Sequence, residues 1–129
     1  MTINAEVKGN LLADPEQKVV QVKGENKTIT QIRIWSDVYK KDAADEFSQD
    51  GEKSMPVNVT IWSERLGGEL MRLLGKGMRV IAQGELTIQT WVDKESGEHK
   101  HQAHIDANHV SLALNRVEEI KMRQKESNG

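Results

Sequence analysis

The sequence of 129 residues predicts an all-β domain with one short helix. Apolar and polar side chains alternate in residues 57–62, as they do on a strand with one buried face. The same alternation returns in residues 86–91. Between these two runs, leucines in residues 66–74 follow the spacing of three and four that is typical of a helix. A chain of this length builds one core, so a single domain is expected.

The order of the predicted elements indicates which all-β fold the chain adopts. Gly9 and Asn10 interrupt the first strand and indicate a bend or bulge. Residues 38–54 are polar and without periodicity, which indicates either a long loop that clasps a ligand or a solvated hairpin tip. Five principal strands with a helix between the third and fourth give a five-stranded OB-fold, a partly open Greek-key barrel. Strand segments are expected at residues 3–12, 18–22, 28–37, 57–62, 84–91 and 102–110.

The predicted helix has recognisable ends. Ser63 is suited to cap its N-terminus, Glu64 suits the positive helix start, and Gly75 suits the stop. Gly67 and Gly68 each cost about 1 kcal/mol of helix propensity relative to alanine. The pair is tolerable in a helix if another element packs closely against it.

Composition restricts the function classes. The chain has 36% apolar and 29% charged residues and no cysteine, which excludes disulfides and a thiol nucleophile. No run of about 18 apolar residues predicts a membrane span, and the N-terminus lacks a secretory signal. We expect a cytoplasmic protein. The net charge of −2 leaves nucleic-acid binding open, because the distribution of charge matters more than its sum.

Aromatic side chains fall on the face of the predicted sheet that carries polar residues. Trp62 shares its strand face with small polar residues, and so does Trp91. Trp35 shares a face with Arg33. Exposed aromatic rings interleaved with basic residues are typical of surfaces that stack the bases of single-stranded nucleic acids. A half-buried packing role is the alternative for any one tryptophan, and a subunit contact is the alternative for Trp35 in particular.

Four motifs resemble those of bacterial single-stranded DNA-binding proteins, the SSB family. The segment Gly-Asn-Leu-Leu-Ala-Asp-Pro-Glu at residues 9–16 resembles the first strand and turn of the family, and residues 28–36 resemble its second principal strand. Leu-Leu-Gly-Lys-Gly at residues 73–77 resembles the exit from its helix. Gly-Glu-Leu at residues 84–86, followed by Trp-Val-Asp at residues 91–93, resembles the next strand and loop.

The resemblance covers roughly residues 4–112 and implies an OB-fold domain over residues 1–112. It implies base-stacking roles for Tyr39, Trp62 and Trp91, and basic contacts at Lys76 and Lys40. For residues 113–129 we expect a short C-terminal helix or a disordered tail.

The sequence also departs from the family pattern. Pro56 stands where members have another stacking tryptophan, and Glu64 stands where a lysine is common. Fewer phosphate contacts predict weaker binding with a shallower salt dependence. The sequence ends without the acidic tip of the housekeeping members. Replication or recombination proteins therefore stay candidate partners, but not through such a tip.

We expect a non-enzymatic protein that binds single-stranded DNA without sequence preference. It would protect unpaired DNA during replication, recombination, repair or transfer. A homo-oligomer is expected, with a tetramer favoured over a dimer, because one barrel offers few contacts. The expected DNA-binding residues are Arg33, Trp35, Tyr39, Lys40, Lys41, Trp62, Lys76, Arg79 and Trp91.

Other functions fit the sequence less well. No cofactor is expected, and the histidines at positions 99, 101, 104 and 109 lack the acids or cysteines that would complete a metal site. Two alternatives stay open. One is a primosome-type accessory OB protein that acts mainly through protein partners, and the other is an OB module that binds RNA or oligosaccharides.

Overall fold

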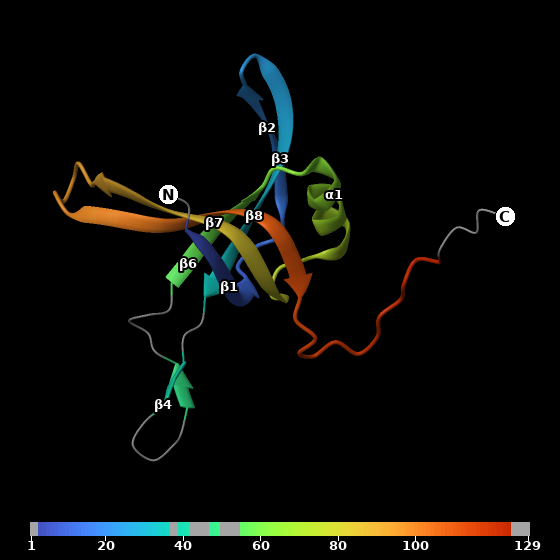
Figure 1. Ribbon diagram of the computed structural model, residues 1–129. Coiled ribbons are helices and arrows are strands. Elements are labelled where there is room, and N and C mark those ends of the chain that lie inside the picture. Colours follow the sequence, from blue (N-terminus) through green and yellow to red (C-terminus); the bar gives the residue numbers. More distant parts are fainter. Residues whose placement is uncertain (1–2, 37–38, 42–46, 50–54, 125–129) are drawn as a thin grey trace.

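The main sheet closes into a barrel. The computed structural model describes residues 3–36, 39–41, 47–49 and 55–124 (Figure 1). Six strands run in the order β1-β7-β8-β6-β3-β2, and β1 also pairs with β3, which closes the ring. The predicted all-β OB-fold with one short helix is confirmed. The elements are β1 (Asn4–Leu11), β2 (Glu16–Val22), β3 (Glu25–Ser36), β4 (Tyr39–Lys41), β5 (Phe47–Gln49), β6 (Met55–Ile61), α1 (Glu64–Leu73), β7 (Arg79–Val92) and β8 (His99–Leu112).

The alternating apolar residues of the strands form the core. Every second residue of β6 points inward, and the same holds for β3 and for the middle of β8. The buried face expected for residues 57–62 is therefore confirmed. The buried face expected for residues 86–91 is not, because Leu86 is only partly buried and Ile88 is 53% exposed on the projecting end of β7. The buried cluster comprises Val7, Leu11, Ile32, Ile34, Val57, Val59, Ile61, Leu70, Val80, Ala82, Ala103, Ile105 and Ala107.

The stretch between β3 and β6 contains a short antiparallel pairing. β4 and β5 pair antiparallel, with Tyr39 opposite Gln49 and Lys41 opposite Phe47. The pairing agrees with a hairpin, one of the two alternatives for residues 38–54, and a role in clasping a ligand stays a prediction. Strands of three residues are too short to show a period in the sequence, so alternation could not reveal them.

Gly9 lies where the barrel closes. β1 pairs with β7 through Asn4–Asn10 and with β3 through Gly9–Leu11, so Gly9 has a neighbouring strand on both sides. A Cβ atom at Gly9 would overlap the backbone carbonyl of Trp35. The glycine permits close approach of two backbones. The pairing of β1 continues through Gly9 without a shift in register on either side, so the bulge expected at this position does not occur.

Helix α1 begins and packs as its sequence predicts. The Ser63 hydroxyl accepts a hydrogen bond from the backbone N–H of Leu66 at 3.2 Å. Leu70 is buried in the core. Gly67 lies against the side chain of Thr30 on β3, where a Cβ would overlap its Oγ1 atom, whereas a Cβ at Gly68 would meet no atom within 4 Å. The expected close packing therefore holds for the first glycine of the pair alone.

The two neighbouring glycines are expected to respond oppositely to alanine. Gly68→Ala should raise the free energy of unfolding by about 1 kcal/mol, because it adds helix propensity in open space. Gly67→Ala should lower it by about 1–3 kcal/mol, because Thr30 is buried and cannot yield without displacing α1. Urea denaturation of both variants measures the difference. Equal shifts would contradict the packing of α1 against β3.

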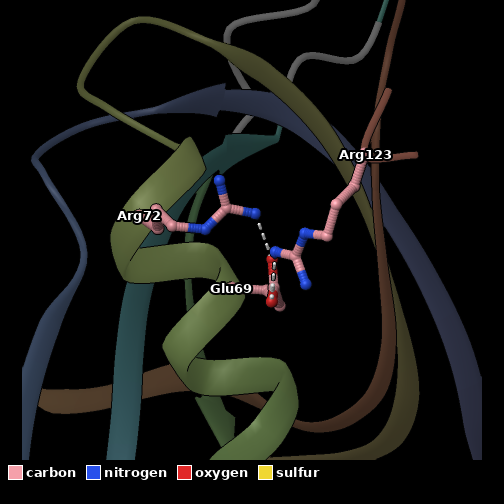
Figure 2. Close-up of polar contacts among 3 residues, drawn as sticks. All are labelled: Glu69, Arg72 and Arg123. Carbon is pink, nitrogen blue, oxygen red and sulfur yellow. Dashed lines mark hydrogen bonds and ion pairs between the residues drawn. The ribbon is translucent and has the colours of Figure 1, made fainter. Parts of the chain in front are cut away.

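The segment after β8 runs back to α1. Residues 113–124 contain no helix, and Arg116 has a φ of 65°, which a right-handed helix does not accommodate. The alternative of a short terminal helix is therefore not realised in these residues. Arg123 Nη2 lies 3.2 Å from Glu69 Oε1, and Arg72 Nη2 lies 2.6 Å from Oε2 of the same carboxylate (Figure 2). Arg72 and then Arg123 hold the pKa of Glu69 below its usual value.

The contact between Arg123 and Glu69 is expected to weaken with acid and with salt. The folded pKa of Glu69 is depressed, so the contact is intact above that pKa and is lost as the pH falls through it. Glu69→Gln should increase the motion of residues 117–124 at neutral pH and abolish its pH dependence. NMR order parameters of that segment measure the effect. Glu25→Gln, at the start of β3, should leave the segment unchanged.

Within the described ranges, no helix combines the length and the apolar character that crossing a bilayer requires.

Candidate nucleic-acid interface

The outer face of the barrel is a continuous polar surface across four strands. One row of paired residues crosses these strands. On β3 and β6, Arg33 lies opposite Asn58; Asn58 in turn lies opposite His104 on β8. His104 lies opposite Thr87 on β7. Arg33 and Thr87 are exposed. Because this row alternates with the buried core residues, all four side chains project to the solvent side. The row gives an extended ligand a path across the sheet.

Trp62 lies at the edge of this surface, directly after the last residue of β6. Its side chain is 45% exposed. The indole Nε1–H donates a hydrogen bond to Asp106 Oδ1 on β8 at 3.1 Å. His104 Nε2 lies 3.1 Å from the same oxygen. The tryptophan is therefore outside the core, as predicted, and one of its edges is held by the neighbouring strand.

Trp91 lies on the part of β7 that projects beyond the barrel. The β7–β8 hairpin extends well away from the rest of the sheet (Figure 1), and the side chain of Trp91 is 46% exposed opposite Lys100. Asp93 shapes the tip, since its Oδ1 accepts backbone hydrogen bonds from Glu95 at 2.8 Å and Ser96 at 3.4 Å. Lys100 Nζ lies 3.2 Å from Asp93. The hydrogen bond from Glu95, with those from Lys100 and Ser96, lowers the pKa of Asp93.

The two exposed tryptophans occupy separate positions. Trp62 bonds to Asp106, and Trp91 lies opposite Lys100, six residues earlier on β8. At about 3.4 Å per strand residue this separation is roughly 20 Å. The two indoles are therefore two separate exposed rings along the sheet.

Trp35 and Arg79 lie on either side of Asn10. In the paired strands Asn10 is opposite Trp35 on β3 and opposite Arg79 on β7. Arg79 Nη1 donates a hydrogen bond to Asn10 Oδ1 at 2.8 Å. Trp35 and Arg79 are both half-buried. The fold thus brings these two predicted residues to one part of the surface, although they are far apart in the sequence.

Lys76 is exposed in the turn between α1 and β7. Its backbone N–H donates to Asp14 Oδ1 at 2.8 Å, which ties the turn to the β1–β2 connection. Lys76 and Arg79 also line a groove of about 1100 Å³, whose other wall is the segment after β8. That wall adds Arg116, a basic residue for which the sequence held no local signal. The groove is lined by Asn10, Leu73, Lys76, Gly77, Met78, Arg79, Leu112, Ala113, Asn115, Arg116, Val117, Glu118 and Glu119.

The side chains of Tyr39, Lys40 and Lys41 lie outside the described part of the structure, although the strand that contains them is described. The structure therefore leaves their expected DNA contacts as predictions.

The histidines of β8 do not assemble a metal site. His104 bonds to Asp106, but among the residues that the structure describes no three His, Cys, Asp or Glu side chains converge as ligands. The polar chemistry of this face is hydrogen bonding and charge.

The comparisons with known proteins agree with this architecture. The profile of the single-strand binding protein family matches residues 4–113. The chain resembles the crystal structure of a small single-stranded DNA-binding protein from Streptomyces coelicolor, with a TM-score of 0.70, 20% identity, and coverage of 90% of this chain and 98% of that one. It also resembles a Plasmodium falciparum SSB in complex with single-stranded DNA, with a TM-score of 0.58, 15% identity, and coverage of 85% and 91% respectively. Among curated proteins, none matches the sequence.

The matched region takes in the whole barrel, from β1 to the end of β8, together with the exposed tryptophans. The family is non-enzymatic, as the sequence analysis expected of this protein. Since the profile spans most of the sequence and the solved relatives share the barrel, the chain belongs to the single-strand binding protein family.

Proposed function

We propose that this protein binds single-stranded DNA without sequence preference and keeps it unpaired and protected during replication, recombination, repair or transfer. The observation that carries the proposal is the exposure of Trp62 and Trp91, each close to half exposed, in a protein of this family. Trp62 lies at the edge of the outer barrel face and Trp91 lies on the projecting β7–β8 hairpin. A large apolar ring outside the core gains by stacking on a base, at about 1–3 kcal/mol per base. Every base offers such a face, so the binding tolerates any sequence.

Charge along the path supports the same function. Arg33 is exposed on the outer face, and Lys76 and Arg79 border the groove beside it. From the sequence, Trp35, Tyr39, Lys40 and Lys41 complete the proposed contact set. Each cation that pairs with a phosphate of a single strand releases counterions and contributes about 0.7 to the slope of log K against log salt concentration.

We further propose that the protein acts as a homo-oligomer, with a tetramer favoured. Two stacking positions and a short basic path on one barrel limit its affinity for DNA. Several barrels joined in one assembly would let one strand contact each of them in turn and gain avidity without new kinds of contact.

Titration of the intrinsic tryptophan fluorescence with oligo-dT tests the proposal. Stacking should quench the emission strongly, and the end point should give a site size of many nucleotides. Sedimentation with and without oligo-dT measures the oligomeric state in the same samples. Oligo-rU of equal length tests the preference for DNA. No quenching and no co-sedimentation with any oligonucleotide at low salt would refute single-strand binding by this protein.

A further inference from the structure

A carboxylate lies in the middle of the proposed DNA-binding face. Asp106 on β8 projects outward opposite Thr60 on β6 and Glu85 on β7, and its side chain is 42% exposed. One of its oxygens, Oδ1, accepts the indole Nε1–H of Trp62 at 3.1 Å and also lies 3.1 Å from His104 Nε2. The carboxylate therefore connects the side chains of Trp62 and His104.

The placement is unfavourable for binding a polyanion unless the carboxylate has another use. A negative charge on this face repels phosphates, by an amount that salt and solvent reduce. The carboxylate of Asp106 is exposed to solvent, so it is not a buried charge that helps to hold the core together. Its two hydrogen-bond partners are the ring edge of a proposed stacking residue and a histidine on its own strand.

Trp62 needs such a partner, because its backbone is not part of the sheet. β6 ends at Ile61 and α1 starts at Glu64, so Trp62 lies in the connection between them. With Trp62 45% exposed, packing constrains only part of its ring. The bond to Asp106 favours the orientation in which the indole N–H edge meets β8. A ring held in advance loses less conformational entropy when a base stacks on it.

We propose that Asp106 is a positioning residue for single-strand binding. It holds the indole of Trp62 in the orientation that accepts a base, and His104 holds the carboxylate of Asp106 in place. This inference rests on the proposed function, and it assigns Asp106 a favourable effect on DNA binding in spite of its charge.

The direction in which DNA affinity changes distinguishes a positioning role of Asp106 from simple charge repulsion. Asp106→Ala should weaken the binding of labelled oligo-dT, measured by fluorescence anisotropy, by about fivefold, the effect of one hydrogen bond of about 1 kcal/mol. Glu85→Ala is the matched control, because it removes an exposed carboxylate from the same face, directly opposite Asp106, without touching Trp62. If the negative charge alone mattered, both variants would bind oligo-dT as tightly as the wild-type protein or more tightly. Equal behaviour of the two variants would overturn the inference.

A double-mutant cycle shows whether Asp106 acts through the indole. Trp62→Phe keeps a stacking ring and lacks the N–H group, so in that background Asp106→Ala should no longer weaken binding. Asp106→Asn keeps an acceptor oxygen and should restore most of the affinity that Asp106→Ala loses. An equal loss in the wild-type and Trp62→Phe backgrounds would assign Asp106 a role other than positioning Trp62.

The free protein supplies a readout that does not involve DNA. In an NMR spectrum, Asp106→Ala should shift the Trp62 indole N–H resonance and speed its exchange with water, while the Trp91 indole signal stays unchanged. An unaltered Trp62 signal would overturn the inference even where DNA binding is intact. Failure of the unmodified protein to bind oligo-dT would instead refute the proposed function, so the two failures are distinguishable.

Discussion

Replacing Trp62 and Trp91 together with alanine is expected to weaken oligo-dT binding by about 2–6 kcal/mol, the sum of about 1–3 kcal/mol for each stacked base. The two positions are about 20 Å apart along β8 and share no described hydrogen bond, so their effects should add. Fluorescence anisotropy with labelled oligo-dT measures the single and double variants on one scale. The fold should persist, because both indoles lie outside the core cluster.

The control for this experiment lies on the same hairpin. Ile88 on β7 is 53% exposed and belongs to the opposite strand face from Trp91. Ile88→Ala removes an exposed apolar side chain near the hairpin tip without removing a stacking ring, and it should leave affinity unchanged. Phenylalanine at both tryptophan positions should retain part of the binding. Unchanged affinity in the double alanine variant would refute stacking as the basis of binding.

Gly9→Ala is expected to destabilise the protein by about 3 kcal/mol or more, at the upper end of overpacking costs. The added Cβ would overlap the carbonyl of Trp35, and a backbone atom in a paired strand cannot move away as a flexible side chain can. Relief therefore requires β1 to separate from β3, which opens the barrel at its closing pair. Urea denaturation measures the loss of stability.

Separation of β1 from β3 at Gly9 should also disturb the proposed DNA-binding face. Asn10 is the next residue of β1, and it lies between Trp35 and Arg79. We expect the Gly9 variant to weaken DNA binding where it still folds. Gly68→Ala is the matched control, since it adds the same methyl group in open space. Wild-type stability of Gly9→Ala would show that the barrel does not close at this pair.

Alternation in the sequence was sufficient to predict the strands, and the order of the elements predicted the barrel. A half-buried strand shows its period of two locally, so the inward faces of β3, β6 and β8 could be read without knowing their neighbours. The helix was equally local, because Ser63 and the leucine spacing lie within its own length. Short or irregular elements were not accessible in this way. The β4–β5 pairing has three residues per strand, and the spacing at residues 113–120 suggested a helix that does not form.

By itself, the sequence determined the buried face of β6, the position of Trp62 outside the core, and the family to which the chain belongs. Only the tertiary structure decided which of the exposed groups meet. Trp62 and Asp106 are 44 positions apart, and Asn10 and Arg79 are 69 apart, yet each pair shares a hydrogen bond. Such contacts depend on the register between paired strands, which a local pattern does not specify because it repeats every two residues. For that reason the proposed role of Asp106 on the DNA-binding face depends on its contact with Trp62, which only the tertiary structure reveals.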